Sequence, residues 1–225
     1  MRTVLLFDID GTLILTGGAG RRAMVGALAR LHGRDDVFDG LSFAGMTDRA
    51  IIRHGLGRVL PAVNETDIDG ALDAYVGLLE DELSRSDAYR VLPGVRELLD
   101  RIRGLADIAI GLGTGNVRRG AFAKLARGGL DRDFDFGGFG CDAEDRVELL
   151  RAGARRGAEI LGETLETCRV VVIGDTPKDV AAAKGLGATC IGVGTGGFTP
   201  EELRACGAAH AFATLEAKEI PSVLF

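Results

Sequence analysis

The ten residues VLLFDIDGTL, numbered 4–13, join a hydrophobic run to two acidic residues in a chain of 225 residues. Four apolar residues lead directly into Asp8 and Asp10, which are separated by one isoleucine and followed by a Gly-Thr turn. An apolar run without polar alternation predicts a strand that is covered on both faces, as in a parallel sheet. Two carboxylates placed this close repel each other and are costly to remove from water. Another group must therefore offset that cost.

The rest of the chain repeats the pattern of a short apolar run followed by a helix. Further strands are predicted at 108–112, 170–173 and 190–193, with weaker candidates at 134–136 and 210–212. Helical patterns lie between these runs, at 94–104, 118–128, 145–161 and 178–186. Strands that alternate with helices of this length are typical of an α/β protein with a doubly wound, Rossmann-like parallel sheet.

The stretch from residue 17 to residue 89 interrupts this alternation. It contains no convincing strand and predicts helices at 21–31, 48–58 and 68–83. We interpret 17–89 as an α-helical cap domain that is inserted after the first strand and lies over the strand ends. The α/β core domain would then comprise 1–16 and 90–225. The alternative is that these helices simply pack on the sheet.

Charge and composition narrow the possible partners. The net charge is −6, aromatic residues make up 5% of the chain, and Trp is absent. This balance argues against binding to nucleic acids or anionic membranes, and no apolar stretch has the length of a membrane span. The four cysteines form no C-x-x-C pair, which favours reduced thiols in a cytoplasmic protein. We expect a monomer or homodimer with no nucleic-acid or membrane partner.

Polar residues follow three of the apolar runs at the point where each predicted strand ends. They occupy 8–12, 113–116 and 174–179. Ligands of open α/β sheets lie beside the carboxyl ends of the strands, so we expect these residues at one edge of the sheet. A hard divalent ion would offset the repulsion among carboxylates there, and Mg²⁺ also admits phosphate oxygens. The sequence therefore predicts an Mg²⁺ site formed by Asp8, Asp10, Asp175 and Asp179.

The two acidic residues of the first run can have different roles. Along an extended segment, Asp8 and Asp10 point to the same side because side chains alternate. Asp8 is then placed to attack a phosphorus atom and form an aspartyl-phosphate. Asp10 would protonate the departing alcohol and later activate a water molecule. This pair predicts a phosphoryl-transfer reaction.

Three of these motifs together resemble a known enzyme family. Residues 8–13 (DIDGTL), Thr114 and residues 174–179 (GDTPKD) are similar to the first, second and fourth motifs of the haloacid dehalogenase (HAD) superfamily of hydrolases. Residues 45–48 (GMTD) and 113–116 (GTGN) are most similar to its phosphoglycolate-phosphatase branch. The resemblance covers essentially the whole chain, including a helical cap after the first motif.

The resemblance implies a role for each matching residue. It makes Asp8 the nucleophile and Asp10 the acid and base of the reaction. Magnesium would be bound by Asp8, the main-chain carbonyl of Asp10 and Asp175, with Asp179 close by. A phosphate oxygen would be bound by Thr114 together with the backbone of Gly115 or Asn116.

The third motif of the superfamily normally supplies a lysine, and here the sequence departs from the pattern. Residues 140–146 (GCDAEDR) contain no lysine, and Arg146 occupies the expected place. A guanidinium can pair with a carboxylate and a phosphate at once. We therefore predict Arg146 as a catalytic and phosphate-binding cation. Lys178 is the alternative.

Three residues of the helical stretch are candidates for substrate contact. Arg21 begins the first predicted helix, where it could face the mouth of the site. Thr47 and Asp48 stand at the start of the second helix, where either could cap free backbone N–H groups. The resemblance places this loop near the non-phosphate end of the substrate.

These observations favour an Mg²⁺-dependent phosphomonoesterase that hydrolyses a small, phosphoglycolate-like phosphorylated metabolite through an aspartyl-phosphate. A sugar phosphomutase of the β-phosphoglucomutase type is the alternative enzyme, because it would use the same core residues. A non-catalytic binding protein on the same fold is the third hypothesis. The presence of all the core acidic residues argues against the third.

Overall fold

The computed structural model describes residues 1–224 and contains a six-stranded parallel sheet. Its strand order is β5-β4-β1-β6-β7-β8, so β1 lies in the interior between β4 and β6. The chain builds one side of the sheet before it crosses to the other, which puts the topological switch point beside β1. The strands are β1 (Thr3–Phe7), β4 (Ile108–Gly113), β5 (Gly137–Gly138), β6 (Arg169–Gly174), β7 (Thr189–Val193) and β8 (His210–Phe212).

Helices cover both faces of this sheet, which confirms the predicted doubly wound α/β fold. Alternate residues of β1 enter different hydrophobic clusters: Leu5 and Phe7 join one, Val4 and Leu6 the other. The first cluster is closed by α4 (Val95–Ile102), α5 (Arg118–Arg127) and α9 (Ile220–Leu224). The second is closed by α6 (Arg146–Ile160), α7 (Pro177–Leu186) and α8 (Pro200–Ala205). Burial on both faces explains why the inner residues of these strands are apolar.

One of the two weaker strand predictions is confirmed and the other is wrong. Residues 210–212 form β8, but 134–136 do not form a strand, because the pairing with β4 falls on Gly137 and Gly138. A side chain on Gly138 would collide with the backbone of Leu149 in α6. Phe134 and Phe136 are buried, so the apolar pattern reported burial and not strand pairing.

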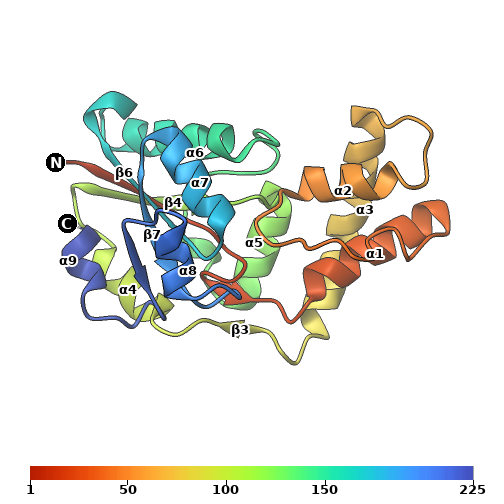
Figure 1. Cartoon of the computed structure of the whole chain (residues 1–225), viewed down its shortest axis with the longest axis horizontal. Coiled ribbons are helices and arrows are strands. Elements are labelled where there is room, and N and C mark those ends of the chain that lie inside the picture. The colour runs from red at the N-terminus through yellow and green to blue at the C-terminus, as the bar shows by residue number, and fades with distance from the viewer. Residues whose placement is uncertain (225) are drawn as a thin grey trace.

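Helices α1 (Ala19–His32), α2 (Asp48–Leu56) and α3 (Glu65–Ser84) form a separate group, called here the helical segment. It has its own buried core, which includes Leu28, Ile52 and Leu79. Figure 1 shows these helices together at the end of the molecule opposite the N-terminus, with α5 beside them. The predicted domain boundaries at 17 and 89 stay a prediction.

Two short strands join the helical segment to the sheet. Strand β2 (Ile14–Leu15) pairs in antiparallel fashion with β3 (Arg90–Val91), so the chain leaves and returns side by side. Two 3₁₀ turns complete the described elements, at Asp131–Asp133 and Leu165–Thr167. Within residues 1–224, no helix combines the length and apolarity that crossing a membrane requires.

Candidate active site

Three acidic side chains meet at the carboxyl ends of the central strands. Asp8 follows β1, Asp175 follows β6, and Asp179 lies in the first turn of α7. One carboxylate oxygen from each lies within 4.8 Å of the other two, and all three side chains are buried. The structure therefore brings together three of the four carboxylates that the sequence predicts to converge.

Burial makes this arrangement electrostatically costly without a cation. Desolvation, together with the nearby Asp179, raises the pKa of Asp8 to about 7, although Arg146 opposes that shift. Desolvation and the charge of Asp8 raise the pKa of Asp175 to about 9. Like charges in a dry site favour the protonated forms, and a bound cation favours the ionised forms instead. Three buried carboxylates are the oxygen donors that a hard divalent ion prefers.

Two glycines allow the Asp175 carboxylate to pack against the first motif. Gly11 has a φ of 90°, and a Cβ on either Gly11 or Gly196 would collide with that carboxylate. The Thr12 hydroxyl donates a hydrogen bond to Asp175 Oδ1 over 3.0 Å. The Asp-Gly-Thr turn therefore positions an acidic residue that lies 163 positions beyond Thr12 in the chain. Gly196 comes from the glycine-rich loop after β7.

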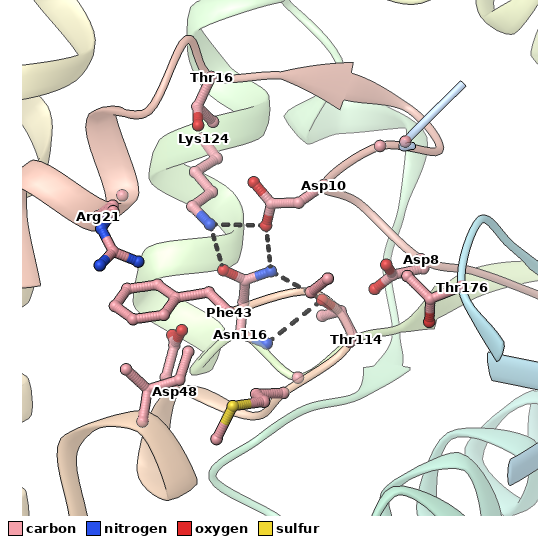
Figure 2. Close-up of a pocket in the computed structure, with 18 of the residues that line it drawn as sticks. Asp8, Asp10, Thr16, Arg21, Phe43, Asp48, Thr114, Asn116, Lys124 and Thr176 are labelled. Carbon is pink, nitrogen blue, oxygen red and sulfur yellow. Dashed lines mark hydrogen bonds and ion pairs between the residues drawn. The ribbon is translucent and has the colours of Figure 1, made fainter. Parts of the chain in front are cut away.

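The carboxylate of Asp10 lies apart from the other three and has different partners. Its Oδ2 atom accepts hydrogen bonds from Lys124 Nζ at 2.6 Å and from Asn116 Nδ2 at 2.9 Å. Figure 2 shows both contacts, with Asp8 on the far side of Asp10. The Asp10 side chain thus lines the same cavity as Asp8 and Asp175 but lies outside the cluster of three carboxylates. Strand β1 ends at Phe7, so side-chain alternation does not continue to Asp10.

Lys124 is a functional candidate that the sequence reasoning missed. It lies on α5, its side chain is 6% exposed, and its Nζ also donates to Asn116 Oδ1 at 2.6 Å. The adjacent charges of Asp10 and Asp48 raise its pKa against the opposing effect of desolvation. The sequence did contain a sign of this role. Lys124 lies three positions after Ala121, on the face of α5 that is buried, and an apolar residue is expected there.

The loop after β4 connects Asp10 to the predicted phosphate site. Asn116 donates to Thr114 Oγ1 twice, from its backbone N at 3.3 Å and from Nδ2 at 2.8 Å. Both acceptor positions of the hydroxyl are then used, so its hydrogen is free to point at a ligand. Gly115 touches the helical segment: its carbonyl accepts from the backbone N–H of Asp48 at 2.8 Å. Thr114, Gly115 and Asn116 all line one cavity with Asp8.

Arg146 stands beside the carboxylate cluster at the start of α6. It forms an ion pair with Asp179, and its Nη2 lies 3.8 Å from Asp8 Oδ1. Its buried Nε–H has no partner among residues 1–224. Lys178 is exposed and does not line the cavity. Of the two cations considered from the sequence, Arg146 is therefore the one that faces Asp8.

Arg21 reaches the cavity from α1, but its polar contacts are made within the helical segment. Its guanidinium donates to the carbonyls of Leu41 at 2.9 Å and Phe38 at 2.7 Å. The same group stacks on the Phe43 ring, 4.5 Å from the ring centroid. Arg21 and Phe43 both line the cavity, and Figure 2 shows the guanidinium over the ring. The hydrogen bonds to main-chain carbonyls hold the guanidinium in place.

Thr47 and Asp48 have different positions although they are neighbours. Thr47 caps α2 by accepting from the backbone N–H of Ala50, and it is not among the residues that line the cavity. Asp48 lines the cavity and accepts from the backbone N–H of Val117 at 2.8 Å. Desolvation raises the pKa of the buried Asp48 carboxyl to about 6. The structure thus assigns Thr47 a capping contact and leaves Asp48 facing the cavity.

These groups surround one cavity of about 380 Å³ between the strand ends and the helical segment. The wall at the strand ends carries Asp8, Asp10, Asp175 and Arg146. The opposite wall is largely apolar and is formed by side chains of the helical segment, including Met24, Phe43, Met46 and Ile51. A doubly wound sheet with a polar cavity at its switch point is the arrangement in which α/β proteins bind ligands.

Comparison with known proteins identifies the class. The family model of haloacid dehalogenase-like hydrolases matches residues 3–187, and the chain belongs to this family. The "Probable phosphatase IndB" of Dickeya dadantii (strain 3937) is 26% identical over 239 residues, which span 98% of this chain and 99% of that protein.

Solved structures share the fold over nearly the full length. CbbY from Rhodobacter sphaeroides, in complex with phosphate, has a TM-score of 0.70 at 23% identity, and the match covers 96% of this chain and 95% of CbbY. A predicted phosphoglycolate phosphatase from Haemophilus somnus 129PT has a TM-score of 0.69 at 14% identity, and the match covers 100% and 98% of the two chains. At these identities the likeness shows a common fold.

Proposed function

We propose that the protein is an Mg²⁺-dependent phosphatase that hydrolyses small phosphomonoesters through an aspartyl-phosphate on Asp8. The observation that carries this proposal is the meeting of three buried carboxylates with a buried arginine whose Nε–H has no partner among the described residues. Such a site has places for both a divalent cation and a phosphate group. Membership of a hydrolase family and the name of the IndB relative support the same conclusion.

The donor set fits magnesium. Asp8, Asp175 and Asp179 would hold the ion, with the main-chain carbonyl of Asp10 as the resemblance implies. The bound ion would offset the repulsion within the cluster and stabilise negative charge on the phosphate oxygens. The raised pKa values of Asp8 and Asp175 mark the two groups whose ionised forms depend most on such a cation.

The residues of the chain can carry both halves of the reaction. An Asp8 oxygen attacks phosphorus, the bond from phosphorus to the substrate alcohol breaks, and Asp10 gives its proton to the departing oxygen. A water molecule then attacks phosphorus and gives a proton to Asp10, and the bond to Asp8 breaks to release inorganic phosphate. The Thr114 hydroxyl and Arg146 would hold the phosphate oxygens during both steps.

The helical segment is proposed to act as the cap of this site. Its own hydrophobic core and its antiparallel β2–β3 connection support a unit that can move against the sheet. Its contact with the loop after β4, through Asp48 and Gly115, closes the cavity on one side. Closure of this kind excludes bulk water from the reaction. A small phosphorylated metabolite is the substrate that a closed cavity of this volume would admit.

Removal of magnesium tests the proposed function directly. We expect steady release of phosphate from p-nitrophenyl phosphate with Mg²⁺, and a loss of at least about 100-fold in a chelator that Mg²⁺ restores. Steady turnover supports a phosphatase, whereas a single burst without further release would indicate the mutase alternative. Absence of turnover with Mg²⁺, or turnover that the chelator does not change, would contradict the proposal.

Arg146 is expected to contribute strongly to phosphate binding. Arg146→Ala should lower kcat/KM by about 100-fold because it removes a charge-assisted, two-point contact from a desolvated site. Arg146→Lys should recover only part of this loss, since an ammonium is a point charge. Lys178→Ala is the matched control and should stay within about twofold of wild type, because Lys178 does not line the cavity. Activity of Arg146→Ala within a few-fold of wild type would count against this role.

A further inference from the structure

The hydroxyl group of Tyr75 is buried without a partner at the helical-segment side of the cavity. Tyr75 lies on α3 and is 0% exposed, and its Oη has no hydrogen-bond partner among residues 1–224. Burial, with the charges of Asp48 and Asp10, raises its pKa well above the usual value, so it remains an O–H donor. A buried hydroxyl without a hydrogen-bond partner is unfavourable. Because Tyr75 lines the cavity, a bound ligand can supply the missing partner.

Two glycines border this hydroxyl. A Cβ on Gly120 of α5 would lie 3.5 Å from Tyr75 Oη. A Cβ on Gly20 of α1 would lie 4.0 Å from the same oxygen and 3.4 Å from Lys124 Nζ. The hydroxyl and the ammonium therefore share one neighbourhood, and Lys124 is the residue that contacts Asp10. The leaving group of a substrate, which departs beside Asp10, would pass into this space.

The charges in this part of the cavity disfavour an anionic leaving group. Asp48 presents a buried carboxylate to the cavity, and within residues 1–224 only its Oδ2 accepts a hydrogen bond, from Val117. The ammonium of Lys124 is engaged by Asp10 and Asn116. The surrounding wall is largely apolar apart from Arg21, whose guanidinium donates to the carbonyls of Leu41 and Phe38. A second negative charge on the substrate would meet the Asp48 carboxylate in a poorly hydrated space, where like-charge repulsion is strong.

We propose that this compartment selects phosphomonoesters whose leaving group is an uncharged alcohol that carries a second oxygen, which accepts a hydrogen bond from Tyr75. The inference rests on the proposed phosphatase function and names the substrate class for that site. It departs from the phosphoglycolate-like substrate that the sequence resemblance suggests, because the leaving group of phosphoglycolate bears a carboxylate. Tyr75 supplies the hydrogen bond, and Asp48 excludes the competing anion.

Three substrates with the same three-carbon skeleton test this selection with Mg²⁺-loaded enzyme. They are glycerol 3-phosphate, which has uncharged hydroxyls, 1-propyl phosphate, which has none, and 3-phosphoglycerate, which has a carboxylate. We expect kcat/KM for glycerol 3-phosphate to exceed that for each of the others by about tenfold, the effect of one satisfied buried hydrogen bond or one repelled charge. Equal values for glycerol 3-phosphate and propyl phosphate, or a preference for 3-phosphoglycerate, would overturn the proposal.

Two substitutions assign the selection to its residues. Tyr75→Phe should lower the ratio of kcat/KM for glycerol 3-phosphate over propyl phosphate by about tenfold. Tyr89→Phe is the control, because it makes the same chemical change at a residue that does not line the cavity. Tyr89 Oη donates to the Lys124 carbonyl at 2.8 Å. This variant should leave the ratio unchanged. Asp48→Asn keeps an oxygen for the Val117 N–H. With 3-phosphoglycerate as substrate, this variant should gain about tenfold in kcat/KM relative to glycerol 3-phosphate.

The outcomes separate this inference from the proposed function. If p-nitrophenyl phosphate is hydrolysed with Mg²⁺ but Tyr75→Phe and Asp48→Asn leave both ratios at their wild-type values, the substrate class is wrong and the phosphatase stands. If no phosphate ester is hydrolysed, both are wrong. Tyr75→Phe removes only an unpaired hydroxyl, so its melting temperature should stay at or above that of wild type.

Discussion

Asp8→Asn should abolish turnover of p-nitrophenyl phosphate, with a fall in kcat of about 10⁴-fold or more. The amide is nearly the same size as the carboxylate but does not attack phosphorus, so no aspartyl-phosphate forms. The measurement is phosphate release with saturating Mg²⁺. Asp100→Asn, the same change on an exposed residue of α4, is the control and should keep wild-type activity. Residual activity of Asp8→Asn within about tenfold of wild type would contradict the assignment of the nucleophile.

The same variant should gain stability when the metal is absent. The pKa of Asp8 in the folded protein, about 7, lies above its ordinary value of 3.8, so the folded state binds this proton more tightly than the unfolded state. In a chelator, the wild-type protein should therefore lose stability as the pH rises from about 4 through 7. Asp8→Asn does not lose stability in this way. The unfolding free energy of the variant minus that of the wild type should therefore increase by about 1–3 kcal/mol between pH 5 and pH 8. An advantage independent of pH would argue against a desolvated Asp8.

Lys124→Met should lower kcat by about 100-fold, with a smaller change in KM. Its ammonium contacts Asp10 at 2.6 Å, and it also contacts Asn116, which in turn binds Thr114. Without the lysine, no cation holds the Asp10 carboxyl group in place. Asp10 is then poorly positioned to give a proton to the departing oxygen of the substrate. We regard Lys124 as a positioning residue because it acts through Asp10.

Two comparisons distinguish positioning from a loss of fold. Lys124→Arg keeps the positive charge and should recover part of kcat, which a purely structural defect would not do. Lys184→Met, at an exposed position near the end of α7, is the matched control and should behave as wild type. Equal losses in Lys124→Met and Lys124→Arg, with unchanged melting temperatures, would show that the charge beside Asp10 is not needed.

Local patterns were sufficient to predict the sheet and part of the site. The apolar runs that became β1, β4, β6 and β7 were predicted because strands buried on both faces need no polar partner. The meeting of Asp8 and Asp175 also followed from the sequence, since parallel strands end at a shared edge. Residues 134–136 mark the limit of such reasoning. Their pattern indicated burial, but the pairing with β4 depended on how closely α6 approaches the sheet.

The amino-acid sequence by itself determined the alternation of strands and helices and the acidic residues at the strand ends, because both depend only on residues that are close together in the sequence. Only the tertiary structure decided that Asp10 turns to Lys124, that Arg146 and not Lys178 stands beside Asp8, and that the Tyr75 hydroxyl is left unpaired among the described residues. These contacts join elements far apart in the chain. A side chain's partner there depends on helix packing in space, which no local periodicity specifies.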